Sequence, residues 1–179
     1  MTERLWNAIA PIAKWWVFLI LLVLFFVGRS RFGDFPTKTF DVRGFYKPSQ
    51  VEGILCEFGD QLGRFLHQQS TLDLVFPIIY SLTFAVGIVW LGGKTAPRWL
   101  VALPFATAFF DYCENISEIV MIRRYEAHQP VPMTFAWIAS IATPIKIVLL
   151  LASFVALIVL AAIRLYRYST AVPSSTFFR

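Results

Sequence analysis

Residues 72–91 read LDLVFPIIYSLTFAVGIVWL, and this stretch decides the fold. It holds a single charged side chain, Asp73, in its first turn. A helix of about 20 residues rises about 30 Å, which matches the hydrocarbon core of a bilayer. Gly92 and Gly93 end the apolar run, and Pro77 predicts a kink within it. The stretch is therefore predicted to be a transmembrane helix.

Three other apolar runs predict three further spans, at about residues 9–27, 99–122 and 134–163. The most apolar part of the first run is too short to cross a bilayer, so its helix is expected to begin near residue 9. Lys14 would then reach the interface along its aliphatic stem. The last run exceeds the core thickness, which predicts a tilt or a bend at Pro144. The pattern predicts an all-α polytopic membrane protein with four transmembrane helices.

The composition agrees with a membrane protein. We expect a single membrane domain spanning residues 1–179, with a disordered tail at 168–179. The chain is 58% hydrophobic and 15% charged, whereas soluble domains are about 45–50% apolar and 25% charged. A disordered chain is excluded, and a soluble enzyme is disfavoured. The net charge of +5 comes from basic residues between apolar runs rather than from a basic stripe. The expected partner is therefore the lipid bilayer, and no nucleic acid is expected.

An amphipathic helix is predicted at about residues 51–68, between the first two spans. Its apolar residues recur at the spacing of one helical face: Val51, Ile54, Leu55, Phe58, Leu62, Phe65 and Leu66. Gly53, Gly59 and Gly63 lower its intrinsic stability, so packing or the bilayer must hold it. An interfacial helix in the headgroup plane needs only this stripe. The alternative is a lid over the mouth of the bundle.

Basic residues set the expected orientation. One side of the membrane would carry seven of them in short segments: Arg4, Lys14, Lys94, Arg98, Arg164, Arg167 and Arg179. The other side carries eight over a much longer stretch. The higher density predicts that both termini are cytoplasmic, in a multi-pass protein of the plasma (inner) membrane.

Residues 109–122 read FFDYCENISEIVMI and place acids inside the third span. Four polar residues follow the i, i+3, i+4, i+7 spacing of one helical face: Asp111, Glu114, Asn115 and Glu118. Charges facing lipid would cost several kcal/mol each, so this face is expected to point into the bundle. The spacing therefore predicts an acidic pocket toward the outer leaflet.

Four other residues complete the candidate pocket: Asp73, Tyr80, Arg64 and Lys146. Lys146 lies deep in the fourth run and could pair with Asp111 or Glu114. Arg64 is expected near the mouth, and Tyr80 could line the cavity or only pack. A single ion pair could serve only to hold two helices together. The acids outnumber the lysine, however, which favours a functional site and requires bound protons or a bound ion.

Enzyme motifs are absent from the sequence. It contains no G-x-S-x-G, no H-E-x-x-H and no E-x-x-H, and no histidine lies within a predicted span. Catalytic residues therefore stay unknown, and no cofactor is required. If a metal binds, Asp111, Glu114 and Glu118 are the candidate ligands, and their oxygens would favour Mg²⁺, Mn²⁺ or Ca²⁺.

One resemblance rests on two runs of residues. They are Gly63-Arg64, Leu72-Asp73, Phe76-Pro77 and Tyr80, and then Leu103-Pro104, Asp111 and Glu114-Asn115. This pattern resembles small four-span bacterial membrane proteins that are themselves uncharacterised. The resemblance covers roughly residues 60–118. It implies a four-span fold and no activity.

The leading hypothesis for function is a pocket that binds a cation or the polar head of a lipid or amphiphile. The second hypothesis is an intramembrane enzyme that uses one carboxyl with a raised pKa as general acid or base. A cation-coupled carrier, which would need an oligomer, and a subunit that docks a partner membrane protein are the remaining alternatives.

Overall fold

The computed structural model describes residues 1–35 and 37–171, and this part of the chain is helical and contains no strand. The all-α class predicted from the sequence is confirmed. The elements in order are α1 (Thr2–Ile9), η1 (Ala10–Ile12), α2 (Trp15–Arg29), α3 (Phe40–Arg43), η2 (Pro48–Gln50), α4 (Val51–Phe58), η3 (Gly59–Gln61), α5 (Leu62–Gly92), η4 (Arg98–Val101), α6 (Ala102–Glu126) and α7 (Met133–Ala171).

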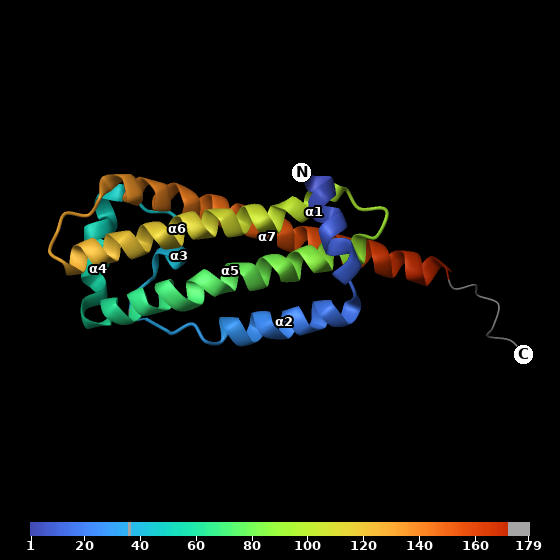
Figure 1. The fold of residues 1–179 in the computed structure, drawn as a ribbon, viewed down its shortest axis with the longest axis horizontal. Helices are drawn as coiled ribbons and strands as arrows, with labels where there is room; N and C mark the ends of the chain where they lie inside the picture. Colours follow the sequence, from blue (N-terminus) through green and yellow to red (C-terminus); the bar gives the residue numbers. More distant parts are fainter. Residues whose placement is uncertain (36, 172–179) are drawn as a thin grey trace, which may run out of the picture.

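The four longest helices, α2, α5, α6 and α7, run side by side along the long axis of the molecule (Figure 1). α6 packs against both α5 and α7, whereas α2 packs chiefly against α5. Two short helices cross the ends of this bundle. α1 lies where α5 ends and α6 begins, and α4 lies at the opposite end (Figure 1).

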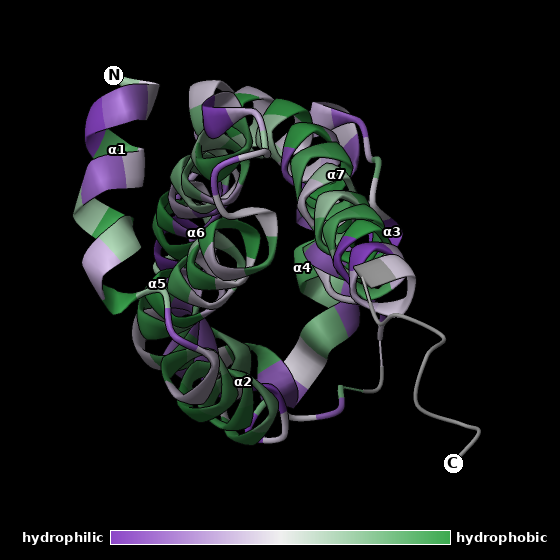
Figure 2. Cartoon of the chain, turned by 90° about the vertical axis from the view of Figure 1, so that its right-hand side faces the viewer, coloured by the Kyte–Doolittle hydropathy of each residue, from purple (hydrophilic) through white to green (hydrophobic). Residues whose placement is uncertain are grey.

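Two helical stretches are long and apolar enough to cross a membrane, Pro48–Gly92 and Met133–Thr170. The sharply bent pair Thr2–Ile12 and Trp15–Arg29 would make a third if it formed one span. The outer surface of α7 is lined with exposed apolar side chains, among them Val148, Val155 and Ile158. In Figure 2 the hydrophobic colour covers the long helices. These features indicate a membrane protein.

The first predicted span is not one helix from residue 9 to residue 27. The chain turns by 98° between η1 and α2, because Pro11 lies in η1 and Lys14 adopts an extended conformation just before Trp15. Lys14 remains near the helix start, 5.8 Å from the ring of Trp16. The segment before the bend forms α1, whose buried residue Trp6 packs on the end of the bundle.

The predicted amphipathic helix at 51–68 is also divided. α4 ends at Phe58, and Gly59 has φ +49°, a conformation that L-residues rarely adopt. The chain therefore turns there, and residues 62–68 form the start of α5. The expected apolar face is buried, but against protein, since its side chains pack with Phe40, Tyr46 and Met121. The apolar face of α4 is therefore covered by protein side chains.

α5 and α7 extend beyond the predicted spans, whereas α6 begins at Ala102, three residues after the predicted start. α5 begins at Leu62 rather than near residue 72, and Pro77 lies within it. α7 continues through Pro144 to Ala171, so residues 168–171 of the predicted disordered tail are helical. Residues 172–179 of that tail lie outside the described residues.

The turn at Gly59 can be tested by adding a Cβ. Gly59→Ala should lower the free energy of unfolding by about 1–2 kcal/mol, because alanine is strained at this positive φ. Gly53→Ala is the matched control, since Gly53 lies within α4 with open space around its Cβ position. Alanine there should be neutral or stabilising. Thermal unfolding in detergent measures both. Equal unfolding temperatures for the two variants would contradict the turn.

Candidate functional site

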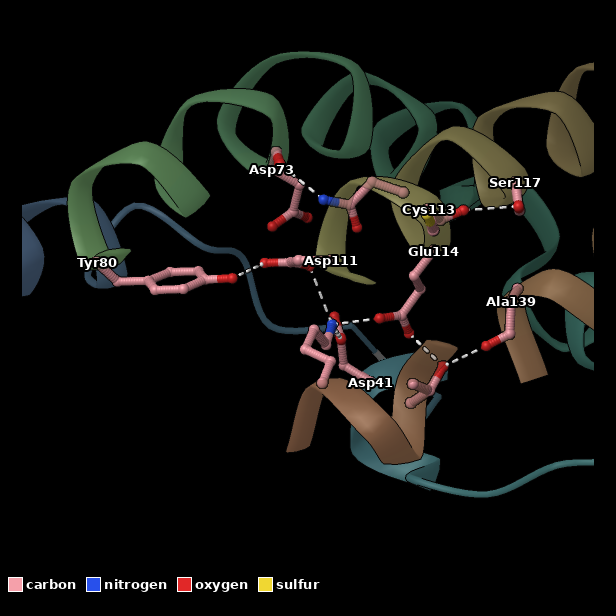
Figure 3. Close-up of polar contacts among 11 residues, drawn as sticks. Asp41, Asp73, Tyr80, Asp111, Cys113, Glu114, Ser117 and Ala139 are labelled. Atoms are coloured by element: carbon pink, nitrogen blue, oxygen red, sulfur yellow. Dashed lines mark hydrogen bonds and ion pairs between the residues drawn. The ribbon is translucent and has the colours of Figure 1, made fainter. Parts of the chain in front are cut away.

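Lys146 of α7 belongs to a buried polar cluster inside the bundle. Figure 3 shows three acids of this cluster, Asp41, Asp111 and Glu114, close to one another. The Lys146 ammonium forms ion pairs with all three, and its Nζ is 3.1 Å from Asp111 Oδ1. Lys146 is 8% exposed and Glu114 is 0% exposed. A charge in such surroundings persists only when it is paired. The pairing expected from the sequence is present, and it includes an additional acid.

Hydrogen bonds join the cluster to its neighbours. The Tyr80 hydroxyl donates to Asp111 Oδ2 at 2.8 Å, and the Thr143 hydroxyl donates to Glu114 Oε1 at 2.6 Å. Asn115 Nδ2 donates to the backbone oxygen of Asp73 at 2.7 Å. Contacts therefore link α5 to α6 and α6 to α7 at the level of the acids.

The third acid reaches Lys146 from outside the long helices. Asp41 lies on α3, the single helical turn within the long connection between α2 and α5. This connection is fixed by Arg43, which forms an ion pair with Glu57 of α4 and donates from Nε to the backbone oxygen of Lys38 at 3.0 Å. The connection and α4 therefore hold Asp41 beside Lys146 of α7.

Several buried polar atoms have no hydrogen-bond partner within the described residues. They are Gln69 Oε1, Asp73 Oδ2, both carboxyl oxygens of Glu118 and the hydroxyl oxygen of Tyr46. Burial raises the pKa of the Tyr46 hydroxyl, and negative charge on Glu118 and Glu114 adds to this effect. Tyr46 therefore stays protonated beside these acids. Unpartnered buried acceptors are costly, which makes them candidate ligand contacts.

A cavity of about 880 Å³ opens beside the cluster. Its walls are mostly apolar side chains from three helices: Phe18, Leu22, Phe25 and Phe26 of α2, Phe76 and Phe84 of α5, and Ile147, Leu150, Leu151, Phe154 and Leu157 of α7. Its polar end is lined by Asp41, Gln69, Asp73, Asp111 and Lys146. Glu114 and Glu118 lie behind this wall and do not line it. Viewed along the bundle, α2 and α7 stand well apart (Figure 2).

The apolar part of the cavity narrows at Gly87. A Cβ at this position would lie 2.7 Å from Leu157 Cδ2 and 2.8 Å from Phe18 Cε2. Because glycine has no side chain, Phe18 of α2 and Leu157 of α7 both approach α5 closely there. The polar part leads instead to exposed charged residues, Arg29, Asp34 and Lys38. The lining of the cavity therefore changes from apolar side chains to charged, exposed residues at its mouth.

The structure brings together most of the residues singled out from the sequence. Six of them contact one another or line the cavity: Asp73, Tyr80, Asp111, Glu114, Asn115 and Lys146. Glu118 is buried without an ion pair in the described part of the chain. Arg64 does not itself line the cavity, but its guanidinium lies beside two residues that do, Gly33 and Phe35, at 5.5 Å from the ring of Phe35.

Four residues of the site were missed from the sequence: Asp41, Tyr46, Gln69 and Thr143. Helical spacing could have identified two of them, since Thr143 precedes Lys146 by three positions and Gln69 precedes Asp73 by four. Asp41 and Tyr46 lie in the long connection, where no periodicity indicates which way a side chain points.

The described residues contain no group of three or more histidine, cysteine or acidic side chains that could hold a metal ion. The suggested ligands Asp111, Glu114 and Glu118 are thus not arranged for this purpose, and Lys146 pairs with the first two.

No family model, no curated protein and no solved structure matches this chain at a significant level.

Loss of the central lysine tests the cluster. Lys146→Met should lower stability by about 3 kcal/mol or more, because it strands three carboxylates. Adding Asp111→Asn to this variant should restore part of the loss. Lys94→Met is the control, since Lys94 is exposed in the turn after α5, and it should change stability by less than about 0.5 kcal/mol. Thermal unfolding in detergent measures all three. A Lys146→Met protein as stable as the wild type would contradict the role of the ion pairs.

Proposed function

We propose that this protein binds an amphiphile, with the apolar chain between α2, α5 and α7 and the polar head at the Lys146 cluster. The single observation that carries the proposal is the cavity, because one continuous space joins an apolar wall to buried polar groups. Asp73 and Gln69 line that space and carry acceptor atoms with no partner in the described chain. An apolar tail and a hydrogen-bonding head would satisfy both parts.

The dimensions of the cavity support this assignment. Ligand pockets in proteins usually measure about 300–1,000 Å³ and combine mainly hydrophobic walls with a few placed polar groups. The cavity of about 880 Å³ falls in this range and has this composition. Because α2 packs chiefly on α5, an apolar chain could enter between α2 and α7 from the surrounding lipid.

The proposal includes a membrane arrangement with four spans, formed by α2, α5, α6 and α7. α6 is 25 residues long, and its acids face the interior, where the ion pairs and α5 shield them from lipid. α1 and the turn before α6 are joined by an ion pair between Glu3 and Arg98. Both belong to the end with the denser basic residues, which supports cytoplasmic termini in the inner membrane.

Cysteine labelling tests this orientation. In a background lacking Cys56 and Cys113, Ser49→Cys and Lys94→Cys place exposed thiols at opposite ends of the bundle. A membrane-impermeant maleimide added to intact cells should label the Ser49→Cys variant and spare the Lys94→Cys variant. Permeabilised cells should show labelling of both. The reverse pattern in intact cells would invert the orientation.

Filling the cavity tests amphiphile binding. Leu151 lines the cavity and is 58% exposed, so Leu151→Trp should occupy the space without disturbing the core. Val148 on the same helix is 65% exposed and does not line the cavity, which makes Val148→Trp the matched control. The probe is a defined phospholipid mixture with ethanolamine and glycerol heads, added to delipidated protein.

Native mass spectrometry then reports the bound lipid. Wild-type protein and the Val148→Trp variant should retain one lipid per chain at collision energies that strip the detergent. The Leu151→Trp variant should lose about tenfold or more in affinity, since the indole would occupy space in the cavity that the acyl chain needs. Equal retention by both tryptophan variants would show that lipid adheres to the outer surface instead.

A further inference from the structure

We infer that the head of the bound amphiphile joins a phosphate to a primary amine, with the amine beside Asp73 and Gln69. This inference rests on the proposed function and specifies its ligand. It starts from the charges at the polar end of the cavity. Four carboxyl groups, those of Asp41, Asp73, Asp111 and Glu114, surround or adjoin one lysine. A second cation in the adjoining space would correct this imbalance.

The hydrogen-bonding groups at the polar end are also unbalanced. Gln69 and Asp73 lie one turn apart on α5, are 1% and 8% exposed, and each offers an unpartnered acceptor oxygen. Three nearby donor groups are already engaged. Tyr80 donates to Asp111, the Asn115 amide donates to a backbone oxygen, and Lys146 faces three carboxylates. A ligand that supplies donors would therefore pair with the two acceptor oxygens, and a primary ammonium has three donors.

The mouth of the cavity is basic, whereas its polar end is acidic. Arg29 and Lys38 line it, both are exposed, and neither forms an ion pair with the described residues. The one acid lining the mouth is Asp34, so the mouth has a net positive charge. Arginine and lysine are the usual partners of phosphate. A phosphate near Arg29 and Lys38, joined by a short linker to an amine beside Asp73 and Gln69, would match both regions.

The test compares lipids with identical acyl chains and different heads. Purified, delipidated full-length protein in detergent is titrated with ethanolamine, choline and glycerol phospholipids, and with a phosphate-free long-chain primary amine. Native mass spectrometry gives the affinity of each. The ethanolamine lipid should bind about tenfold or more tightly than the choline and glycerol lipids, since choline has no N–H donor and glycerol has no positive charge. It should also bind more tightly than the phosphate-free amine.

Two variants test whether the preference for the ethanolamine lipid depends on the carboxyl group of Asp73. Asp73→Asn replaces the unpaired carboxyl with an amide and should reduce the ethanolamine preference to nearly one, while the glycerol lipid still binds. Asp60→Asn is the matched control, because Asp60 is exposed in the turn between α4 and α5. It should keep the wild-type preference.

The possible results distinguish a failure of this inference from a failure of the proposed function. Equal affinity for the three phospholipids, or for choline and ethanolamine, would overturn the primary amine and leave amphiphile binding intact. A phosphate-free amine that binds as tightly as the ethanolamine lipid would overturn the role of the phosphate. If none of the four probes binds, the proposed function itself fails. The wild-type comparison needs no variant, so misfolding of Asp73→Asn would not remove the test.

Discussion

The ion pairs of Lys146 with three carboxylates are the interactions on which the rest of this structure depends. An ammonium inside an apolar bundle requires partners, and here they come from α3 and α6 while the lysine comes from α7. Asp41 has to be brought in from the connection that follows α2. That connection therefore packs against the bundle beside Lys146, and Arg43 and Glu57 join it to α4.

The cavity follows from a difference between α2 and the other three long helices. α5, α6 and α7 exchange polar contacts, whereas α2 has no buried residue and only Arg29 as a charged side chain. α2 therefore contributes an apolar wall and no side-chain polar group to the cluster, and it packs mainly on α5, where its Leu21 backbone oxygen accepts a hydrogen bond from the Thr83 hydroxyl at 3.3 Å. Where glycine permits close approach, at Gly87, α2 and α7 both reach α5. Elsewhere they diverge and leave the space between them.

Helical periodicity predicted much of this arrangement and failed where the chain leaves a regular helix. The spacing of Asp111, Glu114 and Glu118 identified the interior face of α6, and the hydrophobic face at 51–68 was identified correctly. The break within that segment depends on the positive φ of Gly59, which composition does not reveal. Asp41 could not be predicted to pair with Lys146, because the contact joins residues 105 positions apart through an irregular connection.

The most direct test of amphiphile binding is a density map of the full-length protein determined in a lipid environment. The account predicts an elongated feature between α2 and α7, beginning near Phe84 and ending in a head group within hydrogen-bonding distance of Asp73 and Gln69. A map in which α2 packs directly against α7, with no density beside Asp73, would contradict it.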